Sequence, residues 1–190
     1  MKTTIYMVRH GDSPKVGNER TRGLTTKGKR DANEITELLK GEEIDIFLSS
    51  PYDRAILTIE EMAQRAGKEI VVKEDLKERV FFHDDNRHPD NELFPVLEKS
   101  FSDPTYSLPG GESNQECQQR AVSVLNELLT EHQGRKMAIG THGAVMTLMM
   151  HHYDKQYDLS FLLSTSKPDV YKMEFNGQDL VDVQRLWHKE

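Results

Sequence analysis

The 190-residue sequence has one cysteine, Cys117, and no long hydrophobic run. A single cysteine excludes a disulfide bond within the chain and is typical of a reducing compartment. The longest apolar window, Ala144 to Met150, is far shorter than the roughly 20 residues of a membrane-spanning helix. The apolar stretch near the N-terminus is too short for a secretory signal and lacks a small-residue cleavage site. We therefore expect a cytoplasmic protein that has no membrane partner.

The sequence also lacks an excess of positive charge: its formal net charge at pH 7 is −7. This charge disfavours a nucleic-acid partner, since the overall field repels polyanions. It does not exclude a small anionic ligand, which responds to the local field of its pocket. The chain is long enough for one domain with its own core, so we expect a single domain over residues 1–190. Composition leaves open whether this domain is a monomer or a homodimer.

Short apolar runs alternate with helical patterns along most of the chain. The runs at 5–8, 44–48, 70–72 and 137–139 predict strands. Between them, Ser50 as an N-cap followed by Pro51 predicts the start of one helix, and a longer helix is expected to begin near Ser113 or Asn114. Two alternating segments flank Asn176-Gly177 and predict a β-hairpin. This order of elements indicates an α/β fold with a mostly parallel central sheet.

The segment from Phe81 to Pro109 interrupts that alternation. It holds four of the seven prolines, many charged residues and one short apolar pattern. We expect a lid-like insertion with a short helix, resting over one end of the sheet, because long insertions in compact domains are often functional.

Cationic and imidazole side chains follow three of the predicted strands. Arg9 and His10 end the first strand, Arg54 follows the second, and His142 follows the fourth. Ligands of parallel sheets bind outside the carboxyl ends of the strands, so these side chains and the N–H groups of the helix N-termini are expected to converge. Arginine forks and helix N-termini favour phosphate. The histidines add a group that is a nucleophile when neutral and stabilises negative charge when protonated.

Six short motifs occur in the order typical of one enzyme family. They are Arg9-His10-Gly11-Asp12-Ser13, Leu24-Thr25 with Gly28 and Ala32, Ser49-Ser50-Pro51 with Arg54-Ala55 and Thr58, Leu76 with Glu78, Pro109-Gly110-Gly111-Glu112-Ser113, and Thr141-His142-Gly143. With these motifs the chain resembles the histidine phosphatase superfamily. The resemblance implies the phosphoglycerate mutase-like fold, a three-layer αβα sandwich with a mostly parallel central sheet. It also implies an enzyme that acts on a small phosphorylated substrate.

The resemblance further implies that His10 is a nucleophile that becomes phosphohistidine, while Arg9, Arg54 and His142 hold the phosphoryl oxygens. No metal ion and no cofactor are expected, because the arginines supply the charge stabilisation. The substrate-binding residues that it implies are Arg9, Gly11, Arg54, His142 and Gly143.

Glu78 is the expected general acid for the leaving oxygen. The sequence that follows it, from Arg79 to Asp85, departs from the pattern of many phosphatases in the family. Glu112 and Asp85 therefore remain alternatives. His83, Asp84, Asp85 and His88 together suggest a metal cluster, but a solvated loop is the favoured interpretation.

The segment after the first motif separates the activities found within the family. Mutases carry a tryptophan and an asparagine where this chain has Pro14-Lys15-Val16-Gly17-Asn18. The acids of the 81–109 insertion are expected to repel a second anionic group, although Arg20 or Arg22 could contact one at the mouth. The favoured activity is a metal-independent phosphomonoester hydrolase. The first alternative is a cofactor-dependent phosphoglycerate mutase. The second is a catalytically silent phosphate-binding relative, which is less favoured because every matching site position is intact.

Overall fold

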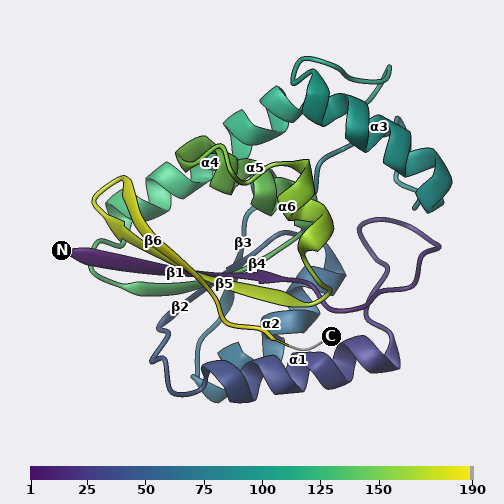
Figure 1. The fold of residues 1–190 in the computed structure, drawn as a ribbon. Helices are drawn as coiled ribbons and strands as arrows, with labels where there is room; N and C mark the ends of the chain where they lie inside the picture. Colours follow the sequence, from purple (N-terminus) through teal and green to yellow (C-terminus); the bar gives the residue numbers. More distant parts are fainter. Residues whose placement is uncertain (189–190) are drawn as a thin grey trace.

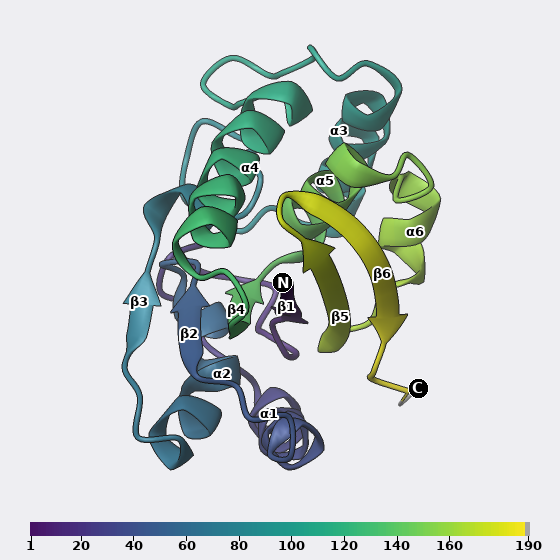
Figure 2. The same ribbon diagram turned by 90° about the vertical axis from the view of Figure 1, so that its left-hand side faces the viewer.

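A central sheet organises residues 1–188, which are the residues described by the computed structural model (Figure 1). Its order is β3-β2-β4-β1-β5-β6 (Figure 2). β1 (Lys2–Arg9), β2 (Ile46–Ser49), β3 (Ile70–Val72) and β4 (Lys136–Thr141) are mutually parallel. β5 (Asp169–Asn176) lies antiparallel to β1, and β6 (Asp179–Arg185) completes a hairpin with β5 through a turn at Gly177. The prediction of a mostly parallel sheet is confirmed.

Helices cover both faces of the sheet and give the three layers visible in Figure 2. α1 (Thr26–Leu39) and α2 (Asp53–Arg65) lie on one face. α4 (Asn114–Glu131), α5 (Gly143–Tyr153) and α6 (Leu159–Ser164) lie on the other. A 3-10 turn, η1 (Glu74–Leu76), and α3 (Asp90–Ser102) connect β3 to α4.

The two faces of β1 explain why its run is apolar without a break. Ile5 and Met7 pack with α4 and α5, whereas Tyr6 and Val8 pack with α1 and α2. Successive side chains of a strand point to opposite faces, so a strand covered on both sides must be apolar throughout. β3 differs from this expectation: it is an edge strand, and Val71 and Val72 are exposed.

Two predicted helix features differ in the structure. α2 begins at Asp53 with Tyr52 as N-cap, so Ser50 and Pro51 precede the helix. The reason is that the Ser50 hydroxyl accepts the Tyr52 N–H and also contacts a histidine of the site described below. The helix of the 81–109 insertion has 13 residues and is longer than expected, because it continues through Pro95.

Gly28 fixes the loop that follows β1. It lies in the first turn of α1, and a Cβ atom at this position would stand 2.2 Å from the carbonyl oxygen of Asp12. The backbone of the Arg9-His10-Gly11-Asp12 segment therefore rests directly on the helix. This contact gives a packing reason for the glycine in the second motif.

We predict that Gly28→Ala destabilises the protein. Alanine favours a helix by about 1 kcal/mol over glycine, but the collision with the Asp12 backbone is expected to cost more, about 1–3 kcal/mol. Thermal unfolding measures the net sign. Gly41→Ala is the matched control, because nothing lies within 4 Å of a Cβ atom there. Equal melting temperatures for the two variants would show that the loop does not rest on Gly28.

Candidate active site

Three parallel strands end at the same level and bring the candidate residues together. Arg9 pairs with Thr141 across β1 and β4, and Ser49 pairs with Gly140 across β2 and β4. The next residues of β1 and β2 continue this ladder, since the N–H of His10 donates to Thr141 and that of Ser50 donates to Gly140. A cavity of about 650 Å³ opens above this edge, and Arg9, His10, Arg54 and Glu78 are among its lining residues.

His10 has one ring nitrogen engaged and one available. Its Nδ1 lies 2.7 Å from the carbonyl oxygen of Gly11, which can only accept a hydrogen bond. In a neutral ring Nδ1 therefore carries the proton, and Nε2 keeps its lone pair. The Nε–H of Arg54 points to that Nε2 atom at 3.4 Å. This geometry leaves Nε2 as the nucleophilic atom of the site.

The environment of His10 keeps the ring neutral. The side chain is buried, and its pKa is lowered well below its usual value, first by desolvation and then by the positive charges of Arg54 and Arg9. A neutral imidazole is the form that can attack phosphorus.

Arg54 reaches the site from the first turn of α2 and is 1% exposed. Its guanidinium donates to the carboxylate of Glu19 at 2.8 Å and also to the Glu19 carbonyl. Burial lowers the Arg54 pKa to about 10, aided by the nearby charge of Arg22 and opposed by Glu19. Glu19 thus compensates a buried cation, and none of the motifs of the sequence includes it.

Arg9 extends from the end of β1 over the start of α5. One terminal nitrogen donates to the Thr165 hydroxyl, while the buried Nε has no partner within residues 1–188. A Cβ atom at Gly143 would lie 2.6 Å from this guanidinium, so a larger residue there would have to displace it. Burial lowers the pKa of Arg9, and the negative charge of Glu78 partly offsets this.

His142 is fully buried beside His10, with 5.2 Å between the ring centroids. Its Nε2 lies 2.7 Å from the Ser50 hydroxyl oxygen. That hydroxyl accepts the Tyr52 N–H, and its own proton has no other acceptor among the described residues. We therefore assign it as the donor to Nε2, which places the ring proton on Nδ1. That Nδ1 is buried and has no partner among the described residues. Burial also lowers the pKa of His142 well below its usual value, so the ring is neutral.

Glu78 occupies the N-terminus of α5. Its carboxylate accepts the N–H groups of Ala144 at 3.1 Å and Val145 at 2.8 Å, as well as that of Arg79 at 2.8 Å. Helix N-termini favour carboxylates. The expectation that free N–H groups of α5 face the crevice is therefore wrong for these two, because Glu78 already uses them.

The two alternative acids lie in different surroundings. Glu112 is not a lining residue of the cavity, and two nitrogens of Arg120 hold its carboxylate. Asp85 lines the cavity but its side chain is exposed. Glu78 alone of the three both lines the cavity and is partly buried.

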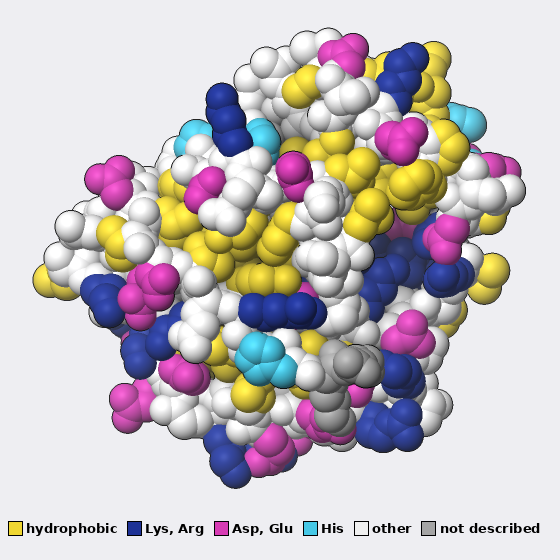
Figure 3. Space-filling model, viewed as in Figure 1, with side chains coloured by type: hydrophobic (Ala, Val, Ile, Leu, Met, Phe, Trp, Pro, Cys, Tyr) yellow, Lys and Arg dark blue, Asp and Glu magenta, His cyan; other side chains and the backbone are white. Residues whose placement is uncertain are grey.

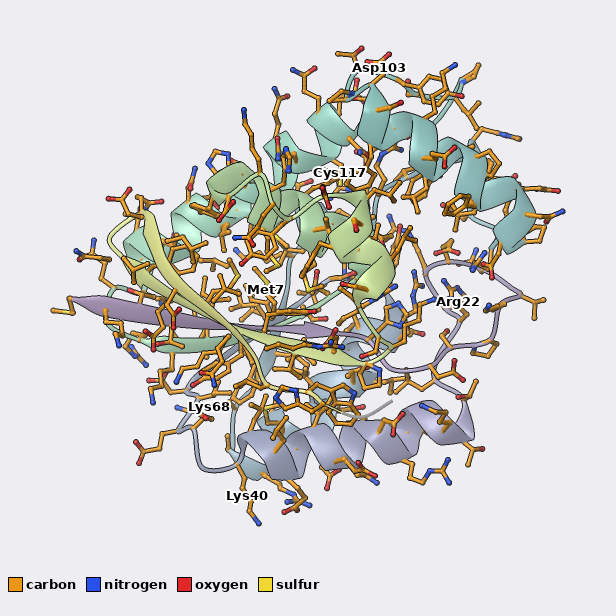
Figure 4. The ribbon with its side chains drawn as sticks, viewed as in Figure 1. Met7, Arg22, Lys40, Lys68, Asp103 and Cys117 are labelled. Carbon is orange, nitrogen blue, oxygen red and sulfur yellow. The ribbon has the colours of Figure 1, made fainter. Side chains whose placement is uncertain are left out.

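The outer part of the cavity combines apolar and charged side chains. Figure 3 shows Lys and Arg side chains in a hollow below a band of hydrophobic surface near α3. Arg22, on the loop between β1 and α1 (Figure 4), lines the cavity, whereas Arg20 pairs with Glu74 outside it. The apolar lining residues from the insertion and α6 are Phe81, Phe82, Leu93, Phe94, Leu97, Leu162 and Leu163.

The charges of the insertion are not arranged as its composition predicted. Asp90 is paired with both Lys15 and Arg87, and Asp84 contacts His88. Repulsion of a second anionic group by free acids is therefore not a property of these two positions. The prediction that the insertion moves as a lid stays a prediction.

The described part of the chain, residues 1–188, contains no group of three or more His, Cys, Asp and Glu side chains placed to hold a metal ion. Within the same residues, no helix is long and apolar enough to cross a membrane.

Comparison with known proteins identifies relatives with phosphatase and mutase names. The chain is 28% identical over 153 residues to the uncharacterized phosphatase PhoE of Bacillus subtilis, covering 78% of this chain and 76% of that protein. It is also 28% identical over 153 residues to the probable phosphoglycerate mutase GpmB of Cronobacter sakazakii, covering 75% and 70%. The phosphatase among these relatives and the family match given below support the prediction of a phosphatase.

The fold has close counterparts among solved structures. The mycobacterial glucosyl-3-phosphoglycerate phosphatase superposes with a TM-score of 0.78 at 17% identity, over 98% of this chain and 99% of that chain. The family model "Histidine phosphatase superfamily (branch 1)" matches residues 5–184. With that match over nearly the whole length, the chain belongs to the histidine phosphatase superfamily.

Proposed function

We propose that this chain hydrolyses phosphomonoesters through a phosphohistidine on His10 and without a metal ion. The observation that carries the proposal is the state of the His10 ring. Its Nδ1 is held by the Gly11 carbonyl, and its unprotonated Nε2 accepts a long hydrogen bond from Arg54 in a buried site. A neutral, oriented imidazole with one unprotonated nitrogen is the arrangement needed for attack on phosphorus.

The groups around His10 can hold a phosphoryl group during that attack. Arg9 Nε and His142 Nδ1 are buried donors without partners, so each has hydrogen-bonding capacity left for an oxygen. Arg54 adds a third donor, and a second cation, next to the nucleophile. Donors fixed in place before the reaction stabilise the charge of the transition state without reorganisation. In this account they supply the stabilisation that Mg²⁺ supplies in many phosphoryl transfers.

The reaction takes two steps. First, the Nε2 lone pair bonds to phosphorus, the bond between phosphorus and the leaving oxygen breaks, and that oxygen takes a proton from Glu78. Glu78 must therefore receive this proton before the attack, because it is a carboxylate in the substrate-free site. Second, a water oxygen bonds to phosphorus, the nitrogen–phosphorus bond breaks, and Glu78 takes the proton from water. Inorganic phosphate leaves, and His10 returns to its neutral form.

The surroundings of the site favour hydrolysis over mutase activity. The Pro14-to-Asn18 segment is exposed and carries no aromatic side chain, and its Val16 is 72% exposed. Its Lys15 is already paired with Asp90. A mutase must exclude water while its intermediate turns round, and no side chain of this segment is placed to do so. Water can therefore reach the phosphoenzyme.

We predict steady release of inorganic phosphate from a panel of phosphomonoesters in excess EDTA. His10→Ala is expected to abolish turnover while it keeps the melting temperature, because it removes the nucleophile and no cationic contact. Phosphate release measured with and without EDTA checks both points.

Three results would contradict the proposal. They are full activity in His10→Ala, loss of turnover in EDTA with recovery on adding one divalent metal, and rapid interconversion of 2- and 3-phosphoglycerate with little phosphate released.

The role of Glu78 predicts a dependence on the leaving group. Glu78→Gln is expected to slow hydrolysis of alkyl phosphates by about 10²-fold or more, since an alkoxide needs its proton. It should slow p-nitrophenyl phosphate much less, because nitrophenolate leaves unprotonated. Asp85→Asn is the control, expected to affect neither substrate strongly. Equal slowing of both esters by Glu78→Gln would move the acid role to another residue.

A further inference from the structure

Lys167 is a cation in the cavity that the reaction above does not use. It lies between α6 and β5, two residues after Thr165, whose hydroxyl accepts a hydrogen bond from Arg9. The antiparallel register of β5 places Asp169 opposite Arg9. Lys167 is thereby held at the same sheet edge as the candidate active site and lines its cavity.

Lys167 differs from the other cations of the cavity mouth in having no partner. Within residues 1–188 its ammonium makes no hydrogen bond and no ion pair. Four other lining cations are each paired with a carboxylate: Lys15 and Arg87 contact Asp90, and Arg22 and Arg54 contact Glu19. The remaining two are Arg79, which is buried and donates to Asn114 and Ser100, and Arg9, which donates to Thr165.

Lys167 stands among the cations of the catalytic cavity. The groups whose charges lower its pKa are Arg9, Arg87, Arg22 and Lys15, all of them lining residues of that cavity. The charge of Lys167 in turn lowers the pKa of His10. The residue also borders a smaller pocket that contains Asp31 and Glu34.

Lys167 is more exposed than the groups that would hold the phosphoryl group. His10, Arg54 and His142 are at most 4% exposed. The Lys167 side chain is exposed, so it stands at the mouth, where the leaving group of a substrate must lie.

We propose that Lys167 binds a second anionic group, a carboxylate or a phosphate, on the leaving group of the substrate. The proposal rests on the proposed function, because it places the reacting phosphoryl group at His10. It assigns the substrate to phosphomonoesters that carry a further negative charge and makes Lys167 a specificity-determining residue.

The charge on Lys167 changes within an accessible pH range. The surrounding protein partly desolvates the ammonium although the residue reaches solvent, and this desolvation, together with Arg9 and the other cations at the mouth, lowers its pKa to about 8. The ammonium is thus charged below about pH 8 and loses its charge above it. Lys15, Arg22 and Arg87 also face this space, but each is paired with a carboxylate.

The test compares an aryl phosphate that bears a carboxylate with its uncharged carboxamide, 3-carboxyphenyl and 3-carbamoylphenyl phosphate. With the wild type, KM for the carboxylate is expected to be about 10-fold lower, the scale of one hydrogen bond between charged groups. Lys167→Gln should remove this preference with little change in kcat, and Lys167→Arg should retain it. Lys155→Gln, at an exposed lysine remote from the cavity, should change nothing.

The same preference should decline in the wild type from pH 7 to 9.5 and persist in Lys167→Arg, whose guanidinium stays charged. Other effects of pH on the enzyme act on both esters and therefore cancel in the ratio of their KM values. Binding of both esters to His10→Ala by calorimetry gives the same comparison without turnover, so an inactive enzyme would contradict the proposed function but not this inference.

Two outcomes would overturn the inference. Equal weakening of both esters by Lys167→Gln would show that the lysine contacts the reacting phosphoryl group. Equal affinity of the wild type for both esters, in turnover and in His10→Ala, would show that no second anion is bound.

Discussion

The contact between His10 Nδ1 and the Gly11 carbonyl is the constraint on which the site depends. A neutral imidazole has one proton, and this contact decides which nitrogen carries it. The carbonyl is itself fixed, because the Gly11 N–H donates to Thr58 and the following backbone rests on Gly28. The second motif and the third motif thus act on the first by holding a short stretch of backbone. The three motifs are far apart in the sequence, but in the structure they pack together around the Gly11 backbone.

The His10 ring stays neutral partly because two arginines are buried beside it, and burying these cations has its own energetic cost. Arg9 and Arg54 depress the pKa of His10, but each is itself removed from water. An uncompensated buried charge costs several kcal/mol, and here the compensation comes from Glu19 for Arg54 and from Glu78 for Arg9. The chain has a formal net charge of −7 and still forms a cationic pocket, because its positive groups are collected at one sheet edge. A phosphate dianion would satisfy the donors that stay without partners.

The sequence predicted those parts that follow from regular structure. Arg9, His10 and His142 converge because parallel strands end at one edge, and Arg54 follows from the first turn of the next helix. Glu19 and Lys167 could not be predicted, because both lie in loops whose path depends on tertiary contacts. The sequence pattern predicts a start of α2 at Ser50, which is too early, for a related reason. The Ser50 side chain contacts His142, a partner 92 residues away, and such a contact cannot be read from the local sequence. The N-terminus of α5 was expected to bind substrate, yet a carboxylate from a distant segment occupies it.

The measurement that tests this account most directly identifies the phosphorylated atom. The protein, labelled with ¹⁵N, is mixed with a phosphomonoester, quenched, and the phosphoprotein is examined by NMR for coupling of phosphorus to the ring nitrogens. The account predicts phosphorylation of His10 at Nε2, since Nδ1 carries the proton donated to Gly11. Phosphate on Nδ1, on another residue, or on no residue at all during turnover would contradict it.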